Sequence, residues 1–211
     1  MPHVVLLGDS IFDNRAYVAG GPDVLEHLRR ELPEGWEATL AAIDGATTDD
    51  MYIQYARIPA GATHLVLSIG GNDALMNVDI LERRASSAAE VLALLADIRD
   101  RFGVGYGEVL RELRRRDLPL TLCTIYEGSF PDARMQRLAS TALTVFNDAI
   151  LRTAVRAGLQ VIDLRLVCCD PGDYANPIEP SVQGGAKIAR AIARAVGATK
   201  DGGPRTEIIG A

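Results

Sequence analysis

The stretch H-V-V-L-L-G-D-S-I-F-D-N, residues 3–14, joins a continuous apolar run to a turn that contains Ser10. A continuous run, rather than an alternating one, is typical of a strand that helices cover on both faces. This stretch therefore predicts a buried parallel strand with a hydroxyl side chain just beyond its carboxyl end. Further runs of the same kind follow along the chain, at residues 38–43, 64–69, 118–125 and 159–164.

Helical patterns separate these predicted strands. They lie at residues 21–32, about 81–102, about 106–116, about 132–157 and 181–196. Strands that alternate with helices predict an α/β fold, here a three-layer α/β/α sandwich around a five-stranded parallel sheet. We expect one domain over residues 1–198 and a Gly-rich C-terminal tail over residues 199–211. The segment G-V-G-Y-G, residues 103–107, has no strand before it, so it predicts a hinge or turn rather than a phosphate-binding loop.

The composition argues against a nucleic-acid-binding or membrane-spanning protein. The formal net charge is −6, and no basic stripe is present that would neutralise phosphates. No apolar stretch is long enough to span a bilayer, and the chain starts in a predicted core strand rather than a signal peptide. The three cysteines suggest neither a disulfide framework nor a metal site. We therefore expect a reduced, cytoplasmic protein.

Polar residues follow the first three predicted strands at the points where those strands end. Ser10 follows the first strand, Gly45 follows the second, and Asn72 with Asp73 follows the third. In open α/β sheets, ligands bind beyond the carboxyl ends of the strands, so these residues should meet at one edge. Acyl transfer requires a nucleophile, such as a hydroxyl, and hydrogen-bond donors, such as a flexible backbone amide and a carboxamide. Each of these residues alone is more typical of a turn or a helix cap.

The three motifs G-D-S-I (8–11), D-G-A-T-T (44–48) and G-G-N-D (70–73) together resemble the first three blocks of the GDSL, or SGNH, hydrolase family. The resemblance implies a flavodoxin-like sandwich and the hydrolysis of a small ester, a thioester or an acetylated sugar without a metal or other cofactor. It also implies that Ser10 is the nucleophile. The backbone amides of Ser10 and Gly45 and the side chain of Asn72 would form the oxyanion hole.

The last block departs from the family. Where the family has Asp-x-x-His before its final helix, this chain has N-P-I-E, so that Asn176 stands in the Asp position and Glu179 in the His position. None of the three histidines is well placed to replace the missing one. His3 and His64 begin predicted strands, roughly 20 Å from the carboxyl edge, and His27 lies within a helix. We therefore expect Glu179 to act as the base or orienting group, with a pKa raised by burial or by a nearby carboxylate.

The candidate substrate-binding residues are Asp9, Asp73, Tyr126 and Asn176, and the segment Leu75–Ser87 is a candidate lid or substrate wall. Two other functions stay open. The first is a catalytically silent protein that binds a ligand on the same fold. The second is a divalent-metal site built from carboxylates, for which Asp173 would join Asp9, Asp73 and Glu179. The expected partner is a small-molecule ester, and the sequence leaves the oligomeric state open.

Overall fold

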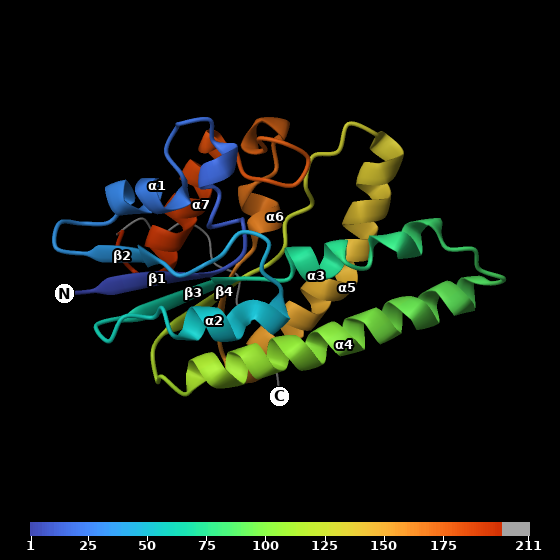
Figure 1. The fold of residues 1–211 in the computed structure, drawn as a ribbon, viewed down its shortest axis with the longest axis horizontal. Coiled ribbons are helices and arrows are strands. Elements are labelled where there is room, and N and C mark those ends of the chain that lie inside the picture. Colours follow the sequence, from blue (N-terminus) through green and yellow to red (C-terminus); the bar gives the residue numbers. More distant parts are fainter. Residues whose placement is uncertain (200–211) are drawn as a thin grey trace.

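The parallel sheet has five strands in the order β2-β1-β3-β4-β5. The computed structural model describes residues 1–199 (Figure 1). The strands are β1 (His3–Gly8), β2 (Glu37–Leu40), β3 (His64–Ser68), β4 (Leu120–Cys123) and β5 (Gln160–Ile162). All neighbouring strands pair in parallel, so their carboxyl ends meet at one edge of the sheet, and the predicted fold class is confirmed.

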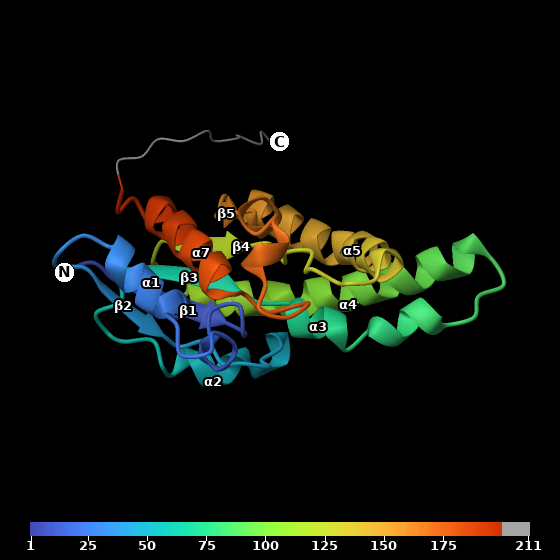
Figure 2. The same ribbon diagram turned by 90° about the horizontal axis from the view of Figure 1, so that it is seen from above.

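Helices cover both faces of the sheet, as Figure 2 shows. One face packs against α1 (Val24–Glu31), α6 (Leu164–Val167) and α7 (Val182–Ala195). The other face packs against α2 (Met51–Tyr55), α4 (Ala88–Arg114) and α5 (Ala133–Ala157). The shorter helices are α3 (Gly71–Leu75), η1 (Arg15–Tyr17), η2 (Thr48–Asp50), η3 (Val78–Glu82) and η4 (Pro171–Asp173).

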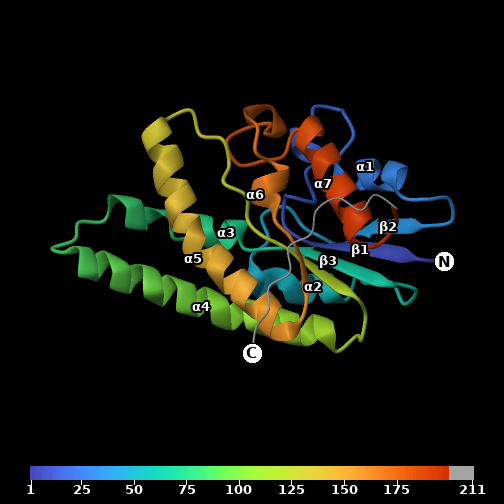
Figure 3. The same ribbon diagram turned by 180° about the vertical axis from the view of Figure 1, so that it is seen from behind.

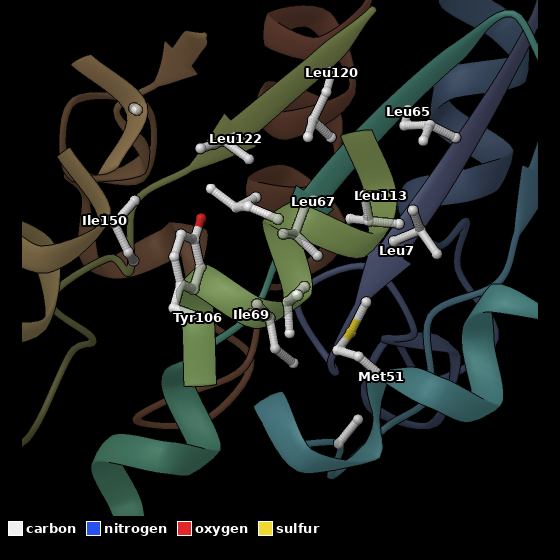
Figure 4. Close-up of a cluster of buried hydrophobic side chains, with 14 of the residues drawn as sticks. Leu7, Met51, Leu65, Leu67, Ile69, Tyr106, Leu113, Leu120, Leu122 and Ile150 are labelled. Carbon is white, nitrogen blue, oxygen red and sulfur yellow. The ribbon is translucent and has the colours of Figure 1, made fainter. Parts of the chain in front are cut away.

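The alternation of side chains along β1 divides the core into two layers. Val5 and Leu7 belong to the cluster under α4 and α5, whereas Val4 and Leu6 belong to the cluster under α1 and α7. All four are completely buried, which explains why the strand reads as a continuous apolar run. Figure 4 shows the first of these clusters, with Tyr106 of α4 packed among the leucines of the sheet.

The predicted hinge at residues 103–107 is wrong, because α4 continues through its three glycines. Glycine weakens a helix by about 1 kcal/mol per residue, but tertiary packing overrides that preference. Phe102, Tyr106 and Leu113 lie on one helix face and are all buried against the sheet. The helix also starts later than expected, because Ser87 caps it by accepting a hydrogen bond from the Glu90 amide.

Several predicted boundaries are confirmed by their capping residues, and others are shorter than expected. Gly158 ends α5 with a left-handed φ of 64°, and Ser181 caps α7. β2 ends at Leu40 rather than residue 43, because the amides of Ala41 and Ala42 both donate to the Leu6 carbonyl and break the register. β5 ends at Ile162, because Asp163 caps α6.

The N-terminal halves of α4 and α5, together with α3 and η3, extend beyond the carboxyl edge of the sheet (Figure 3). This extension places helical side chains next to the loops that follow β1 and β3. Within residues 1–199, no helix is both long enough and apolar enough to cross a membrane. Residues 200–211 of the predicted tail lie outside the described part of the chain.

Candidate active site

Ser10 lies just beyond β1, and Gly8 makes its position possible. Gly8 has a φ of 131°, and a Cβ atom there would lie 1.7 Å from the carbonyl oxygen of Ser68. Only glycine lets the end of β1 approach β3 this closely. The chain then turns, with the Asp9 amide donating to the Ser68 carbonyl at 3.1 Å, and presents Ser10 at the carboxyl edge with 8% of its surface exposed.

The side chain of Glu179 lies opposite Ser10. The Ser10 hydroxyl donates a hydrogen bond of 3.1 Å to Oε1 of Glu179, although the two residues are 169 positions apart. Glu179 is only 6% exposed, and its Oε2 is buried without a hydrogen-bond partner among residues 1–199. Burial raises the pKa of Glu179 from 4.5 to about 7, even though the hydrogen bond from Ser10 lowers it. This carboxylate therefore holds its proton more tightly than a solvated one, as a general base toward a hydroxyl must.

Asn176 shapes the loop that carries Glu179. Its Oδ1 accepts hydrogen bonds from the amides of Ile178 at 3.0 Å and Glu179 at 2.9 Å. The Ala175 amide then donates to the Glu179 carbonyl at 2.8 Å and closes the turn. Asn176 is not among the residues that line the cavity beside Ser10. Its side-chain oxygen is therefore used to hold Glu179 in place.

Tyr126 and Asp173 support the same loop from either side. The Tyr126 hydroxyl donates to the Ile178 carbonyl at 2.5 Å, and the Tyr126 ring also lines the cavity. Asp173 is completely buried and accepts hydrogen bonds from Lys187 at 2.8 Å and from Gln183 at 3.0 Å. These contacts anchor the loop to α7, so the two prolines around Glu179 are not the only restraint on it.

Asn72 and the loop containing Gly45 are joined directly. The Asn72 Nδ2 group donates to the carbonyl of Ala46 at 2.9 Å, which leaves its second N–H free to serve a ligand. Asn72 lines the same cavity as Ser10 and Glu179. Gly45 has a left-handed φ of 79°, which favours glycine at this exposed turn. The contribution of its amide to an oxyanion hole stays a prediction.

Asp73 holds the following turn in place. Its carboxylate accepts hydrogen bonds from the Thr48 amide at 3.1 Å and from the Thr48 hydroxyl at 2.5 Å, and so ties η2 to α3. Burial raises the pKa of Asp73 while these hydrogen bonds lower it. Asp73 does not line the cavity and neither does Asn176, so the predicted role of these two residues in substrate binding stays a prediction.

Asp9 lies next to the nucleophile and is 1% exposed. Its Oδ1 accepts a hydrogen bond from the Ile11 amide at 3.2 Å, whereas its Oδ2 is buried without a partner among residues 1–199. Burial, together with the smaller effect of the charges of Glu179 and Asp73, raises the pKa of Asp9 from 3.8 to about 7. Asp9 lines the cavity together with Ser10. The site therefore contains two buried carboxyl groups that titrate near neutral pH.

The three histidines, all within the described residues, do not line this cavity. His3 begins β1, with its Nε2 2.7 Å from the Thr39 hydroxyl, and His64 begins β3 and stacks on the ring of Trp36. His27 lies in α1, where burial lowers its pKa. Glu179 is thus the titratable side chain that hydrogen-bonds Ser10, and its role as a base stays a prediction.

An apolar cavity of about 150 Å³ opens beside Ser10, and sequence reasoning did not foresee most of its wall. Polar side chains line it at Asp9, Ser10, Asn72, Asn77, Glu127 and Glu179. The predicted wall segment contributes Leu75, Asn77, Val78, Ile80 and Leu81. Most of the unforeseen part comes from α5, which contributes Met135, Ala139, Ala142, Leu143 and Phe146, and α4 adds Leu95 and Ile98. In the sequence, the spacing of these residues indicates only one face of an amphipathic helix. It does not indicate which residues lie across the cavity from that face.

Potential metal ligands gather elsewhere. Within residues 1–199, the only group of side chains close enough to share an ion is Cys169, Asp170 and Asp173. Lys187 already bonds both of these carboxylates, at 2.7 and 2.8 Å. The other carboxylates that the sequence suggested as metal ligands, those of Asp9, Asp73 and Glu179, do not belong to this group.

The profile of the GDSL-like Lipase/Acylhydrolase family matches residues 6–187. A comparison with curated protein sequences gave no match. Solved structures that share the fold include an extracellular lipase from Streptomyces rimosus, with a TM-score of 0.66 and 16% identity over 92% of this chain and 100% of that one. An acetyl xylan esterase has a TM-score of 0.67 and 20% identity over 92% and 99%. Phospholipase A1 from Streptomyces albidoflavus has a TM-score of 0.64 and 15% identity over 92% and 98%.

Proposed function

The chain belongs to the GDSL-like lipase/acylhydrolase family, and from that premise we propose that it is a serine ester hydrolase with Ser10 as nucleophile and Glu179 as general base. The observation that carries the proposal is the hydrogen bond of 3.1 Å from the Ser10 hydroxyl to the Glu179 carboxylate. This distance is within the range at which a general base can remove a proton from a hydroxyl to which it is hydrogen-bonded.

Glu179 accepts the hydroxyl proton as Ser10 Oγ attacks the acyl carbon of the ester. The amides of Ser10 and Gly45 and the Asn72 side chain stabilise the oxyanion of the tetrahedral intermediate. Glu179 then gives its proton to the departing alcohol, and an acyl-serine ester remains. A water molecule transfers a proton to Glu179 and attacks this ester, the acid product leaves, and the proton returns to Ser10 Oγ.

Burial makes a glutamate suitable for this task. A solvated glutamate, with a pKa near 4.3, is a weak base toward serine, whereas the pKa of Glu179 is about 7. The neutral Asn176 fits this arrangement. An aspartate in its place would set a negative charge beside the loop of Glu179, and no imidazolium is present that would need such a charge.

The test measures kcat/KM for p-nitrophenyl butyrate between pH 4 and 9 in the wild type, Ser10→Ala and Glu179→Gln, each with and without a chelator. Since the base acts when ionised, wild-type kcat/KM should rise with pH and reach half its maximum near pH 7. Ser10→Ala should be inactive, and Glu179→Gln should lose roughly 10²- to 10⁴-fold and its dependence on pH. The chelator should have no effect on the wild type.

A second candidate function is ligand binding without catalysis, and the absence of a histidine from the cavity wall in residues 1–199 favours it. The two candidates differ in the reactivity of Ser10. Rapid, stoichiometric labelling of Ser10 by a fluorophosphonate supports the hydrolase. A wild type that stays unlabelled and is as inert as Ser10→Ala on a broad ester panel refutes it.

A further inference from the structure

We propose that the cavity beside Ser10 binds an unbranched hydrocarbon chain of the ester substrate, in its acyl part or its alcohol part, so that the enzyme prefers esters with a medium-length aliphatic chain to those with a short one. The inference rests on the proposed function, since it names the substrate of the same site. It is carried by the position of the cavity along α5, by the chemistry of its wall and by the exposed apolar side chains at its outer end.

The cavity runs along one face of α5. Met135, Ala139, Ala142 and Phe146 all line it, and their spacing places them on the same side of the helix. At 1.5 Å per residue, the stretch from residue 135 to residue 146 covers about 16 Å. The cavity has a volume of about 150 Å³ and lies along this wall, and we refer to it as the channel. A hydrocarbon chain that starts at Ser10 can lie along this wall.

The wall away from Ser10 offers few groups to a polar ligand. No Lys, Arg or His from residues 1–199 lines the cavity, so it presents no cation to a phosphate or a carboxylate. Asn77 donates one of its two Nδ2 hydrogens to the Asp73 carbonyl, and Glu127 accepts a hydrogen bond from Ser140, so each already uses part of its hydrogen-bonding capacity. The other polar lining residues belong to the catalytic end. A hydroxyl-rich ligand would therefore lose hydrogen bonds on entering, whereas a hydrocarbon chain loses none.

Apolar side chains remain exposed where the channel opens. Leu75 is 42% exposed, Val78 is 51% exposed and Met135 is 36% exposed, and all three line the cavity. Deeper along the wall, Ile98 and Phe146 are at most 7% exposed. A chain that extends from Ser10 to the opening would bury the three exposed side chains, whereas an acetyl group would leave them in water.

Alanines set the width of the channel on the α5 side. Ala139 and Ala142 lie between Met135 and the buried ring of Phe146, and both are only half-buried. A leucine at position 142 would fill part of the channel between its two ends. Ala133 provides the matched control, because it is exposed, lies on the same helix and does not line the cavity.

The experiment measures kcat/KM for two ester series in the wild type, Ala142→Leu and Ala133→Leu. One series varies the acyl chain from acetate through butyrate and octanoate to dodecanoate with p-nitrophenol as leaving group. The other varies the alkyl alcohol of acetate esters. In the series whose chain occupies the channel, kcat/KM should rise about four-fold for each added methylene. The series that rises identifies whether the acyl chain or the alcohol is bound.

Ala142→Leu should lower the octanoate-to-acetate ratio of kcat/KM at least ten-fold, or the equivalent alkyl ratio, and Ala133→Leu should leave it unchanged. Met135→Gln tests the outer end with a change at a partly exposed position that endangers the fold less, and it should reduce the preference for dodecanoate. Hydrolysis of acetate with flat profiles in both series overturns the inference alone. If no ester is hydrolysed and Ser10 is not labelled by a fluorophosphonate, the proposed function fails with it.

Discussion

Replacing Asp9 by Asn should make the protein more stable at pH 8 and should have a smaller effect at low pH. Asp9 is buried, and one of its carboxylate oxygens has no partner among residues 1–199, so ionising it in the folded state is unfavourable. Asn has nearly the same shape and keeps the oxygen that accepts the Ile11 hydrogen bond. It cannot ionise, so the variant lacks the dependence on pH that this carboxyl gives to the stability of the wild type.

The magnitude follows from the shift in the pKa of Asp9 from 3.8 to about 7. Below pH 3.8 the carboxyl is protonated in both the folded and the unfolded chain, and it adds no dependence on pH. Between pH 3.8 and 7 the unfolded chain has released the proton and the folded chain has kept it, so stability falls by about 1.4 kcal/mol per pH unit. Over the whole interval the loss is about 4 kcal/mol, and above pH 7 it is constant.

Urea unfolding of the wild type and Asp9→Asn between pH 4.5 and 8 measures this difference. The stability of the variant minus that of the wild type should grow by roughly 3 kcal/mol over this range, most of it below pH 7. Asp79→Asn, a change at an exposed position of η3, controls for the substitution itself. A difference for Asp9→Asn that stays constant with pH would refute the assignment of a buried, unpaired carboxyl beside the nucleophile.

Three further substitutions test the fold and the loop of Glu179. Gly107→Ala in α4 should stabilise the protein by about 0.5–1 kcal/mol in urea unfolding, because no described atom lies within 4 Å of the added Cβ. Gly184→Ala in α7 should instead destabilise it by roughly 3 kcal/mol, since its Cβ would lie 2.1 Å from the Asp173 carbonyl; equal effects of the two changes would contradict the packing described. Asn176→Ala should lower kcat/KM by about ten- to a hundred-fold by releasing the Glu179 amide. Asn176→Asp should restore the rate at high pH but move the half-maximal pH upward, and a failure to do so would argue against the positioning role.

The sheet and the ends of its strands could be predicted because the relevant signals are local. Residues 4–7 are buried on both faces of the sheet, so they form one apolar run in the sequence, and Ser10 comes three positions after the run. The helix end at Gly158 is equally local, since a left-handed residue there favours glycine. These elements fix the edge at which the site forms.

The glycines of α4 were misread because their local preference and their tertiary role differ. Gly105 lies where an added Cβ would be 3.2 Å from the Thr48 hydroxyl, so its small size lets η2 approach the helix. The buried residues on either side, Phe102 and Tyr106, keep the helical spacing that would have indicated continuity. The spacing of these buried residues predicts one continuous helix when it is given more weight than the low helix propensity of glycine.

The roles of Asp73 and Asn176 could not be read from their residue types, because a carboxylate or an amide serves a loop as readily as a ligand. Both turn out to accept hydrogen bonds from backbone amides, Asp73 from Thr48 and Asn176 from Glu179. The α5 wall of the cavity was hidden for another reason. Its residues line a space whose opposite side comes from α3 and η3, far away in the sequence.

The hydrogen bond between Ser10 and Glu179 also has a consequence for biosynthesis. Glu179 follows Ser10 by 169 positions in the chain, so during translation the proposed nucleophile is made well before its proposed base. A nascent chain, or a fragment cut before the last loop, contains the serine without the group that activates it. We therefore expect the proposed activity only in chains that extend at least to Glu179.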